Sequence, residues 1–140
     1  MATLRALREL ITARAGGACE YCRLLQAPTG VTFHIDHIYP RSLGGRTLLS
    51  NLALSCPACN LLKGDQTTAP DSRGQLQPLF NPRLYEQSPL GWHFHFLLDH
   101  ASGIIAAKTS IAEATITALN MNDPDAIIAR QFQIRAGVLG

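Results

Sequence analysis

Residues 33–65 read FHIDHIYPRSLGGRTLLSNLALSCPACNLLKGD, and this stretch decides the fold. An Asp36-His37 pair lies near its start, and Asn51 follows that histidine by fourteen residues. Asn60 comes nine residues later, directly after a Cys-x-x-Cys. Side chains that can bind metals or accept protons therefore recur at intervals through this segment, which indicates a functional site.

The hydrophobic pattern of the same stretch predicts two strands and a helix. The segment from Val31 to Ile38 is rich in β-branched and aromatic residues, and Pro40 ends this expected strand. A second strand is expected around residues 52–54. Pro57 suits the first turn of a helix that Gly64 would end. The order strand, loop, strand, helix is a ββα unit and predicts an α+β fold.

All the cysteines of the chain fall in two Cys-x-x-Cys pairs, separated by 33 residues. They are Cys19, Cys22, Cys56 and Cys59. Each pair can bind one tetrahedral Zn²⁺ through two sulfurs, and two pairs complete a closed, structural zinc site. Free structural thiols and a redox dithiol are the alternatives, but a redox dithiol leaves the second pair unexplained.

Three side chains of the central stretch could together hydrolyse a phosphodiester bond. That reaction needs an activated water and a cation near the leaving oxygen. His37 can act as a general base, and Asp36 offers a hard oxygen ligand for Mg²⁺ or Mn²⁺. Asn60 adds an amide oxygen. The alternatives are a structural histidine, a capping aspartate and a surface asparagine.

With Asn51, Asn60 and the cysteines at these spacings, the segment resembles the HNH endonuclease family, nucleases of the ββα-metal class. The resemblance implies that His37 activates water and that Asp36 and Asn60 hold one divalent ion, Mg²⁺ or Mn²⁺. It also implies that Asn51 hydrogen-bonds backbone groups across the loop and holds the histidine in place. The expected activity is cleavage of DNA to 5′-phosphate and 3′-hydroxyl ends.

Two positions depart from the pattern of that family. Asn60 stands where a histidine is common, and an amide oxygen favours Mg²⁺ or Mn²⁺ over Zn²⁺ or Ni²⁺ at the catalytic position. His34 stands where an acidic residue is common. Because residues 34 and 36 point to the same face of a strand, His34 is a further candidate ligand of the catalytic ion.

Basic side chains near the motif are candidates for contacts with nucleic acid. Residues 1–65 contain seven Lys or Arg against four Asp or Glu, whereas residues 66–140 contain five against six. Lys63, Arg41 and Arg46 are expected to contact phosphates beside the cut, and ordinary surface charge is the alternative. The net charge of the whole chain is only +2.

The rest of the chain predicts elements that flank this unit. A helix capped by Thr3 should end near Gly16. Residues 66–89 contain four prolines and predict a connector with little regular structure. Residues 92–109 predict a β-hairpin whose first strand, 92–98, carries His93 and His95 on its exposed face, and two helices should follow. We therefore expect a nuclease core at residues 1–68, with a C-terminal extension at 69–140 that packs on it.

Other features bound the class of protein. The first fifteen residues do not resemble a secretory signal, and no apolar stretch has the ~18 residues of a membrane span. The chain is therefore expected to be cytoplasmic, with DNA as its partner and a homodimer left open. The alternatives to a nuclease are a zinc-stabilised nucleic-acid-binding module without catalysis and a purely structural zinc protein.

Overall fold

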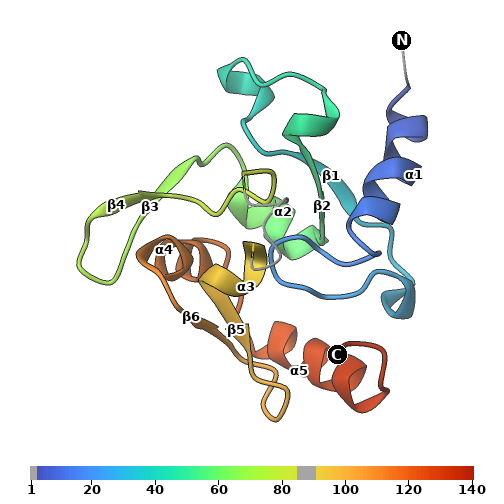
Figure 1. Ribbon diagram of the computed structural model, residues 1–140, viewed down its shortest axis with the longest axis vertical. Helices are drawn as coiled ribbons and strands as arrows, with labels where there is room; N and C mark the ends of the chain where they lie inside the picture. The colour runs from blue at the N-terminus through green and yellow to red at the C-terminus, as the bar shows by residue number, and fades with distance from the viewer. Residues whose placement is uncertain (1–2, 85–90) are drawn as a thin grey trace.

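The computed structural model describes residues 3–84 and 91–140. Five α-helices and three two-stranded antiparallel sheets make up this part of the chain, which confirms the α+β class (Figure 1). Three short 3-10 turns, η1 (Ala27–Thr29), η2 (Arg41–Leu43) and η3 (Leu49–Asn51), lie in the connections. The N-terminus and the last helix lie at opposite ends of the long axis.

A ββα unit forms the centre of the N-terminal half. Strand β1 (His34–His37) pairs with β2 (Leu52–Ser55), and helix α2 (Pro57–Lys63) follows at once. The sequence predicted a longer first strand, over residues 31–38. In the structure residues 31–33 and residue 38 lie outside the pairing of β1 with β2. Asp36 faces Ala53 across the two strands. Gly64 ends α2 with a positive φ of 49°, a conformation that glycine adopts at little cost.

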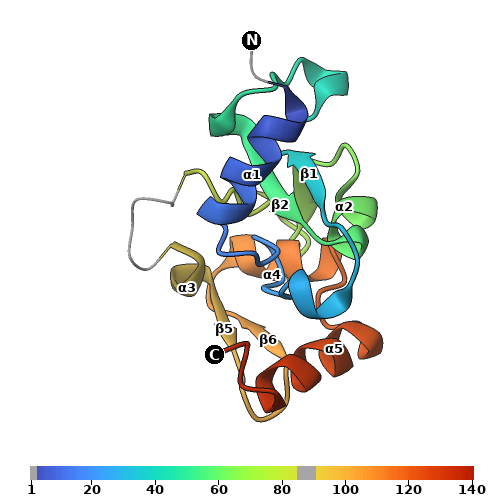
Figure 2. The ribbon, with the colours of Figure 1, turned by 90° about the vertical axis from the view of Figure 1, so that its right-hand side faces the viewer.

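Helix α1 (Leu4–Arg14) packs against this unit (Figure 2). The Thr3 hydroxyl accepts a hydrogen bond from the Ala6 amide at 3.1 Å, as the sequence predicts for an N-cap. Among its apolar residues, Leu7 and Ile11 are buried. Arg14 donates to the Leu52 carbonyl at 2.6 Å. This arginine of α1 therefore binds the neighbouring backbone.

The expected connector contains a β-hairpin, which corrects the prediction for residues 66–84. Strand β3 (Thr68–Pro70) pairs with β4 (Leu76–Pro78), and the Asp71 carboxylate accepts hydrogen bonds from the Arg73 and Gln75 amides at 2.8 and 3.0 Å. Pro70 and Pro78 lie at the ends of the two strands, where the missing N–H costs little, and so they did not prevent pairing. Residues 85–89 of the expected connector lie outside the described residues.

The expected strand over residues 92–98 begins instead as a helical turn. Helix α3 (Gly91–His95) precedes β5 (Phe96–Leu98), which pairs with β6 (Ile105–Ala107) in the expected hairpin. Trp92, His95 and Phe96 are buried, whereas Phe94 is 55% exposed. Burial at positions i, i+3 and i+4 follows a helix, and the alternation in the sequence was misleading. His95 is therefore buried, contrary to the prediction, and His93 is exposed.

Two helices, α4 (Ser110–Ala118) and α5 (Pro124–Arg135), complete the chain as expected. Helix α4 packs against the β3–β4 hairpin and β6. Buried apolar residues from Leu7 to Leu139 form one cluster that includes all four cysteines. The boundary between residues 68 and 69 stays a prediction. Within the described residues, no helix combines the length and apolar character that a membrane crossing requires.

Candidate zinc centre and candidate active site

The four cysteines meet in the interior, between the N-terminal knuckle and the start of α2. Their sulfur atoms all lie within 4.8 Å of one another, and the Sγ atoms of Cys22 and Cys56 are 3.6 Å apart. A tetrahedral Zn²⁺ with bonds of about 2.3 Å spaces its sulfurs about 3.8 Å apart. The cluster therefore fits zinc, and its burial fits a structural role.

The thiols of this cluster cannot all ionise without a cation. Hydrogen bonds from the other three cysteines hold the pKa of Cys56 far below its ordinary value of 9.0. Hydrogen bonds with Cys19, Cys22 and Cys56 raise the pKa of Cys59 far above that value. Four thiolates packed this closely need a metal to neutralise them, as coordination of Zn²⁺ would do.

A separate open cavity of about 290 Å³ brings together the candidate catalytic side chains. Asp36 and His37 reach it from β1, and Asn60 reaches it from α2. Arg41 of η2 and Asp65, just after α2, also line it. The loop between the two strands thus covers one side of the cavity and the short helix the other.

The Asp36 carboxylate is buried, and two side chains bind it. The Tyr21 hydroxyl donates to Oδ2 at 2.7 Å, and the Lys63 ammonium lies 3.2 Å from the same oxygen and donates to Oδ1 at 3.4 Å. Burial raises the pKa of Asp36, while the Lys63 charge and the Tyr21 hydrogen bond act to lower it. A carboxylate has about four acceptor positions, so these three contacts leave about one position for a metal ion.

Lys63 does not lie where the sequence predicted it. Its side chain is 2% exposed, and its ammonium group donates to the carbonyls of His37 and Ile38 at 3.2 and 3.0 Å as well as binding Asp36. A phosphate contact requires an accessible ammonium, so the burial of Lys63 does not support the predicted contact with DNA. The helical spacing placed it correctly near Asn60 but could not reveal that this face is covered by β1.

His37 is half-buried at the rim of the cavity. Its Nε2 lies 2.9 Å from the Thr47 hydroxyl, in the loop between the strands. Partial burial and the nearby Arg41 charge lower the pKa of His37 below its ordinary value of 6.5, and the Asp36 charge opposes them. The imidazole is therefore mostly neutral at pH 7 and can accept a proton.

Asn51 braces the loop that carries Thr47. Its Oδ1 accepts from the Tyr39 amide at 2.8 Å, and its Nδ2 donates to the carbonyls of Tyr39 and Arg46 at 3.1 and 2.9 Å. These are backbone hydrogen bonds across the loop, of the kind that the resemblance implied. They fix the chain directly after His37.

Two of the remaining sequence candidates lie outside the cavity. His34 is exposed at the start of β1 and is not among the residues that line the cavity, so its placement does not support a role as a metal ligand. Arg46 is exposed in the same loop as Arg41, but it too lies outside the lining. Of the expected phosphate contacts, Arg41 alone borders the cavity.

Sequence reasoning missed several residues that support the site. Tyr21 binds Asp36, and Thr47 binds His37. Asp65 lines the cavity, and Glu20 forms an ion pair with Arg83. Glu20 binds the outer edge of β2, because its amide donates to the Leu54 carbonyl and its carboxylate accepts from the Leu54 amide, both at 2.8 Å. Only their position inside the Cys-x-x-Cys knuckle could have singled out Glu20 and Tyr21.

Residues 19–66 match the family model described as HNH endonuclease. The match begins at Cys19, the first residue of the cysteine cluster, and ends just past Asp65, which lines the cavity. No match is found among the curated proteins, and none among the solved structures. The resemblance is thus confirmed for this segment, and it indicates a nuclease or another nucleic-acid-related function.

Proposed function

We propose that this protein is a metal-dependent endonuclease that hydrolyses DNA phosphodiester bonds and leaves 5′-phosphate and 3′-hydroxyl ends. The observation that carries the proposal is the shared cavity. Asp36, His37 and Asn60 come from two different elements, and all three side chains border the same open space. A general base and two hard oxygen ligands at one accessible site are the parts that phosphodiester hydrolysis requires.

His37 would accept the proton of the attacking water. The lowered pKa leaves the ring neutral at physiological pH, as a proton acceptor must be. The Thr47 hydroxyl at 2.9 Å holds Nε2 and restricts rotation of the ring. Asn51 supports this geometry because it binds the backbone at both Tyr39 and Arg46, on either side of the loop.

The Asp36 carboxylate and the Asn60 amide oxygen fit a hard cation such as Mg²⁺ or Mn²⁺. Mg²⁺ commonly binds through one or two carboxylates and completes its shell with water and substrate phosphate, so two protein oxygens suffice. When bound, such an ion neutralises charge on the phosphate and stabilises the leaving oxygen. Tyr21 and Lys63 bind both oxygens of the Asp36 carboxylate and so fix its orientation.

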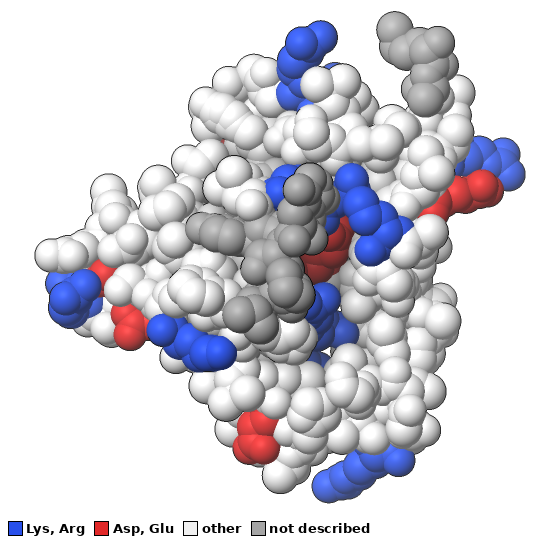
Figure 3. Space-filling view, in the orientation of Figure 1, with Lys and Arg blue, Asp and Glu red and all other residues white. Residues whose placement is uncertain are grey.

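Arg41 is the basic residue best placed to contact DNA, because it lines the cavity. Arg46, exposed in the same loop, would contact a more distant phosphate. Elsewhere the charge is dispersed: Figure 3 shows basic side chains at several separate places on one face, with acidic side chains between them. The basic groups near the cavity are few and are expected to contact phosphates. Phosphate contacts carry no sequence information, so we expect a modest sequence preference.

One observation favours the alternative, a zinc-stabilised nucleic-acid-binding module without catalysis. The Lys63 ammonium already lies 3.2 Å from Asp36 and weakens the attraction of that carboxylate for a second cation. This alternative requires no activated water. It therefore predicts that DNA binding does not depend on His37 and that no metal produces cleavage.

Plasmid cleavage distinguishes the two functions. Purified protein is incubated with supercoiled plasmid in Mg²⁺, Mn²⁺ or EDTA, beside His37→Ala, and the zinc content of each preparation is measured. His34→Ala is the matched control, since His34 lies on the same strand but outside the cavity. We expect metal-dependent nicking or linearisation that falls by roughly 100-fold or more in His37→Ala and is retained in His34→Ala. DNA binding by all three proteins without cleavage in any metal would overturn the proposal.

A further inference from the structure

Helix α5 turns two polar side chains, Arg130 and Gln133, into the protein interior. Gln133 is 5% exposed, and its amide forms hydrogen bonds with both the amide and the carbonyl of Leu25, at 2.8 and 2.9 Å. Leu25 lies three residues after Cys22, in the zinc knuckle. Because residues three apart share a helix face, Arg130 is directed toward the same part of the molecule.

Arg130 is fully buried, and two of its three nitrogens have backbone partners. Nε donates to the Gly103 carbonyl and Nη2 to the Met121 carbonyl, both at 2.7 Å. Nη2 also donates to the Asn122 side chain at 3.2 Å. These bonds join α5 to the β5–β6 turn and to the segment before α5.

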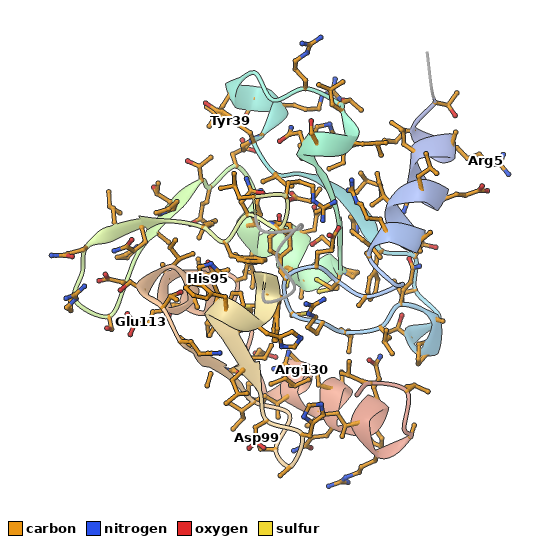
Figure 4. The ribbon with its side chains drawn as sticks, viewed as in Figure 1. Arg5, Tyr39, His95, Asp99, Glu113 and Arg130 are labelled. Atoms are coloured by element: carbon orange, nitrogen blue, oxygen red, sulfur yellow. The ribbon has the colours of Figure 1, made fainter. Side chains whose placement is uncertain are left out.

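The third nitrogen, Nη1, is buried and has no hydrogen-bond partner among the described residues. None of the ion pairs in residues 3–84 and 91–140 gives this guanidinium a carboxylate. An unpaired buried charge costs much free energy, so another group must compensate it. Figure 4 shows that Arg130 lies where α5 faces the rest of the protein.

The cysteine cluster is the charged group on this side of α5, because Gln133, on the same helix face, binds the chain three residues after Cys22. Burial lowers the pKa of Arg130, and the charges of Cys22, Cys59 and Cys56 act against that shift. Zn²⁺ bound by four thiolates carries a net charge of −2, which is itself costly to bury. A buried guanidinium beside this centre offsets part of that charge.

We propose that Arg130 is a positioning residue for the zinc centre: when zinc is bound, the Cys22 sulfur accepts a hydrogen bond from the unpartnered Nη1, and the guanidinium charge stabilises the four thiolates. Through this contact α5, which lies outside the matched HNH segment, becomes part of the surroundings of the metal. The proposal does not depend on DNA cleavage, so it stands or falls separately from the nuclease assignment.

The test compares the zinc-loaded full chain with Arg130→Met, Arg130→Lys and Asn122→Ala. Methionine keeps the length and removes the charge, whereas lysine keeps the charge without the planar fork. Asn122→Ala is the matched control, because it weakens the same backbone network and leaves Nη1 beside the sulfurs. Two quantities are measured: the rate of zinc transfer to a chromogenic chelator, and the thiolate-to-metal charge-transfer absorption of the Co²⁺-loaded proteins.

We expect Arg130→Met to lose zinc roughly 10- to 100-fold faster, the usual effect of removing a partner that orients metal ligands. Arg130→Lys should fall between Met and the wild type. The charge-transfer band should move to lower energy in Arg130→Met, because a thiolate without its donor gives up electron density more easily. Asn122→Ala should keep the wild-type band and lose zinc at about the wild-type rate, even with a lower melting temperature.

Two results would overturn the proposal. One is equal acceleration of zinc loss in Arg130→Met and Asn122→Ala, which would make Arg130 a packing residue only. The other is an unchanged charge-transfer band and an unchanged rate in Arg130→Met. If Arg130→Met does not fold, Arg130→Lys provides the same comparison, and wild-type zinc release and absorption in that variant would equally contradict the role.

Discussion

At the scale of single residues, buried charge determines what the candidate site can do. Asp36 is 5% exposed, yet it borders an open cavity and binds both Tyr21 and Lys63. The carboxylate therefore has a structural role, through Lys63, and an expected role in metal binding. A substitution of Asp36 would remove both roles at once, and so the partners of Asp36 are the more informative residues to change.

Lys63→Met tests the structural role. Removing the ammonium leaves the Asp36 charge buried without its ion pair and leaves the His37 and Ile38 carbonyls without this donor. Breaking a buried pair from one side costs about 3–5 kcal/mol, so we expect a loss of that size in the free energy of unfolding. Urea denaturation of the zinc-loaded protein measures it. Arg41→Met, an exposed change at the same cavity, should shift it by no more than about 0.5 kcal/mol.

His95 should make stability depend on pH. It is 2% exposed, its Nδ1 lies 2.7 Å from the Thr109 hydroxyl, and burial lowers its pKa below the ordinary 6.5. Below pH 6.5 the unfolded chain therefore binds a proton that the folded chain resists, and stability falls as the pH falls. One such group contributes a slope of at most about 1.4 kcal/mol per pH unit.

The comparison that checks this is urea denaturation between pH 5.5 and 7.5 for the wild type, His95→Phe and His93→Gln. His95→Phe should show a shallower decline toward low pH, because phenylalanine cannot bind the proton. His93 is exposed, so His93→Gln should keep most of the wild-type slope. Equal slopes in wild type and His95→Phe would contradict the prediction.

At the scale of elements, the sequence predicted what local signals specify. The ββα order follows from β-branched segments, Pro57 and Gly64, and the zinc cluster follows from cysteine spacing. Elements that depend on distant packing were predicted less well. The alternating pattern predicted that Phe94 lies in a strand. The structure has a helical turn there, because it buries Trp92 and His95 together against the rest of the core. Nor could spacing alone show that β1 covers Lys63.

The loop between β1 and β2 is an element that glycine makes possible. A Cβ atom on Gly45 would lie 1.8 Å from the Tyr39 carbonyl oxygen, so no other residue fits without a shift of the backbone. That same oxygen accepts a hydrogen bond from Asn51, and Thr47, two residues later, contacts His37. The close approach at Gly45 therefore helps to set the position of the candidate general base.

Gly45→Ala should reduce plasmid cleavage by roughly 10- to 100-fold, since a displacement of about 1 Å near a reacting group has effects of that order. The zinc content should not change, because the cysteines lie in other elements. Leu43→Ala is the control: Leu43 is 53% exposed in the same loop, and its truncation leaves the backbone as it is. Wild-type cleavage by Gly45→Ala would show that this loop does not position His37.

At the scale of the whole molecule, the zinc knuckle joins the two halves of the chain. Three residues of the segment 19–25 bind the C-terminal half: the Glu20 carboxylate pairs with Arg83, the Tyr21 carbonyl accepts from the Trp92 indole at 2.8 Å, and the Leu25 amide donates to the Gln133 side chain at 2.8 Å. A change in the knuckle is therefore transmitted to elements far from it in sequence.

Removal of zinc should accordingly unfold both halves together. Structural zinc in small domains binds with about 10–16 kcal/mol, which equals or exceeds the stability of a typical domain. We expect a strong chelator to increase amide hydrogen exchange in β2 and in α5 (Pro124–Arg135) at similar rates, and added zinc, but not added Mg²⁺, to restore protection. If α5 keeps its protection while β2 loses it, the C-terminal half folds independently of the metal, and the knuckle joins two separate units rather than one.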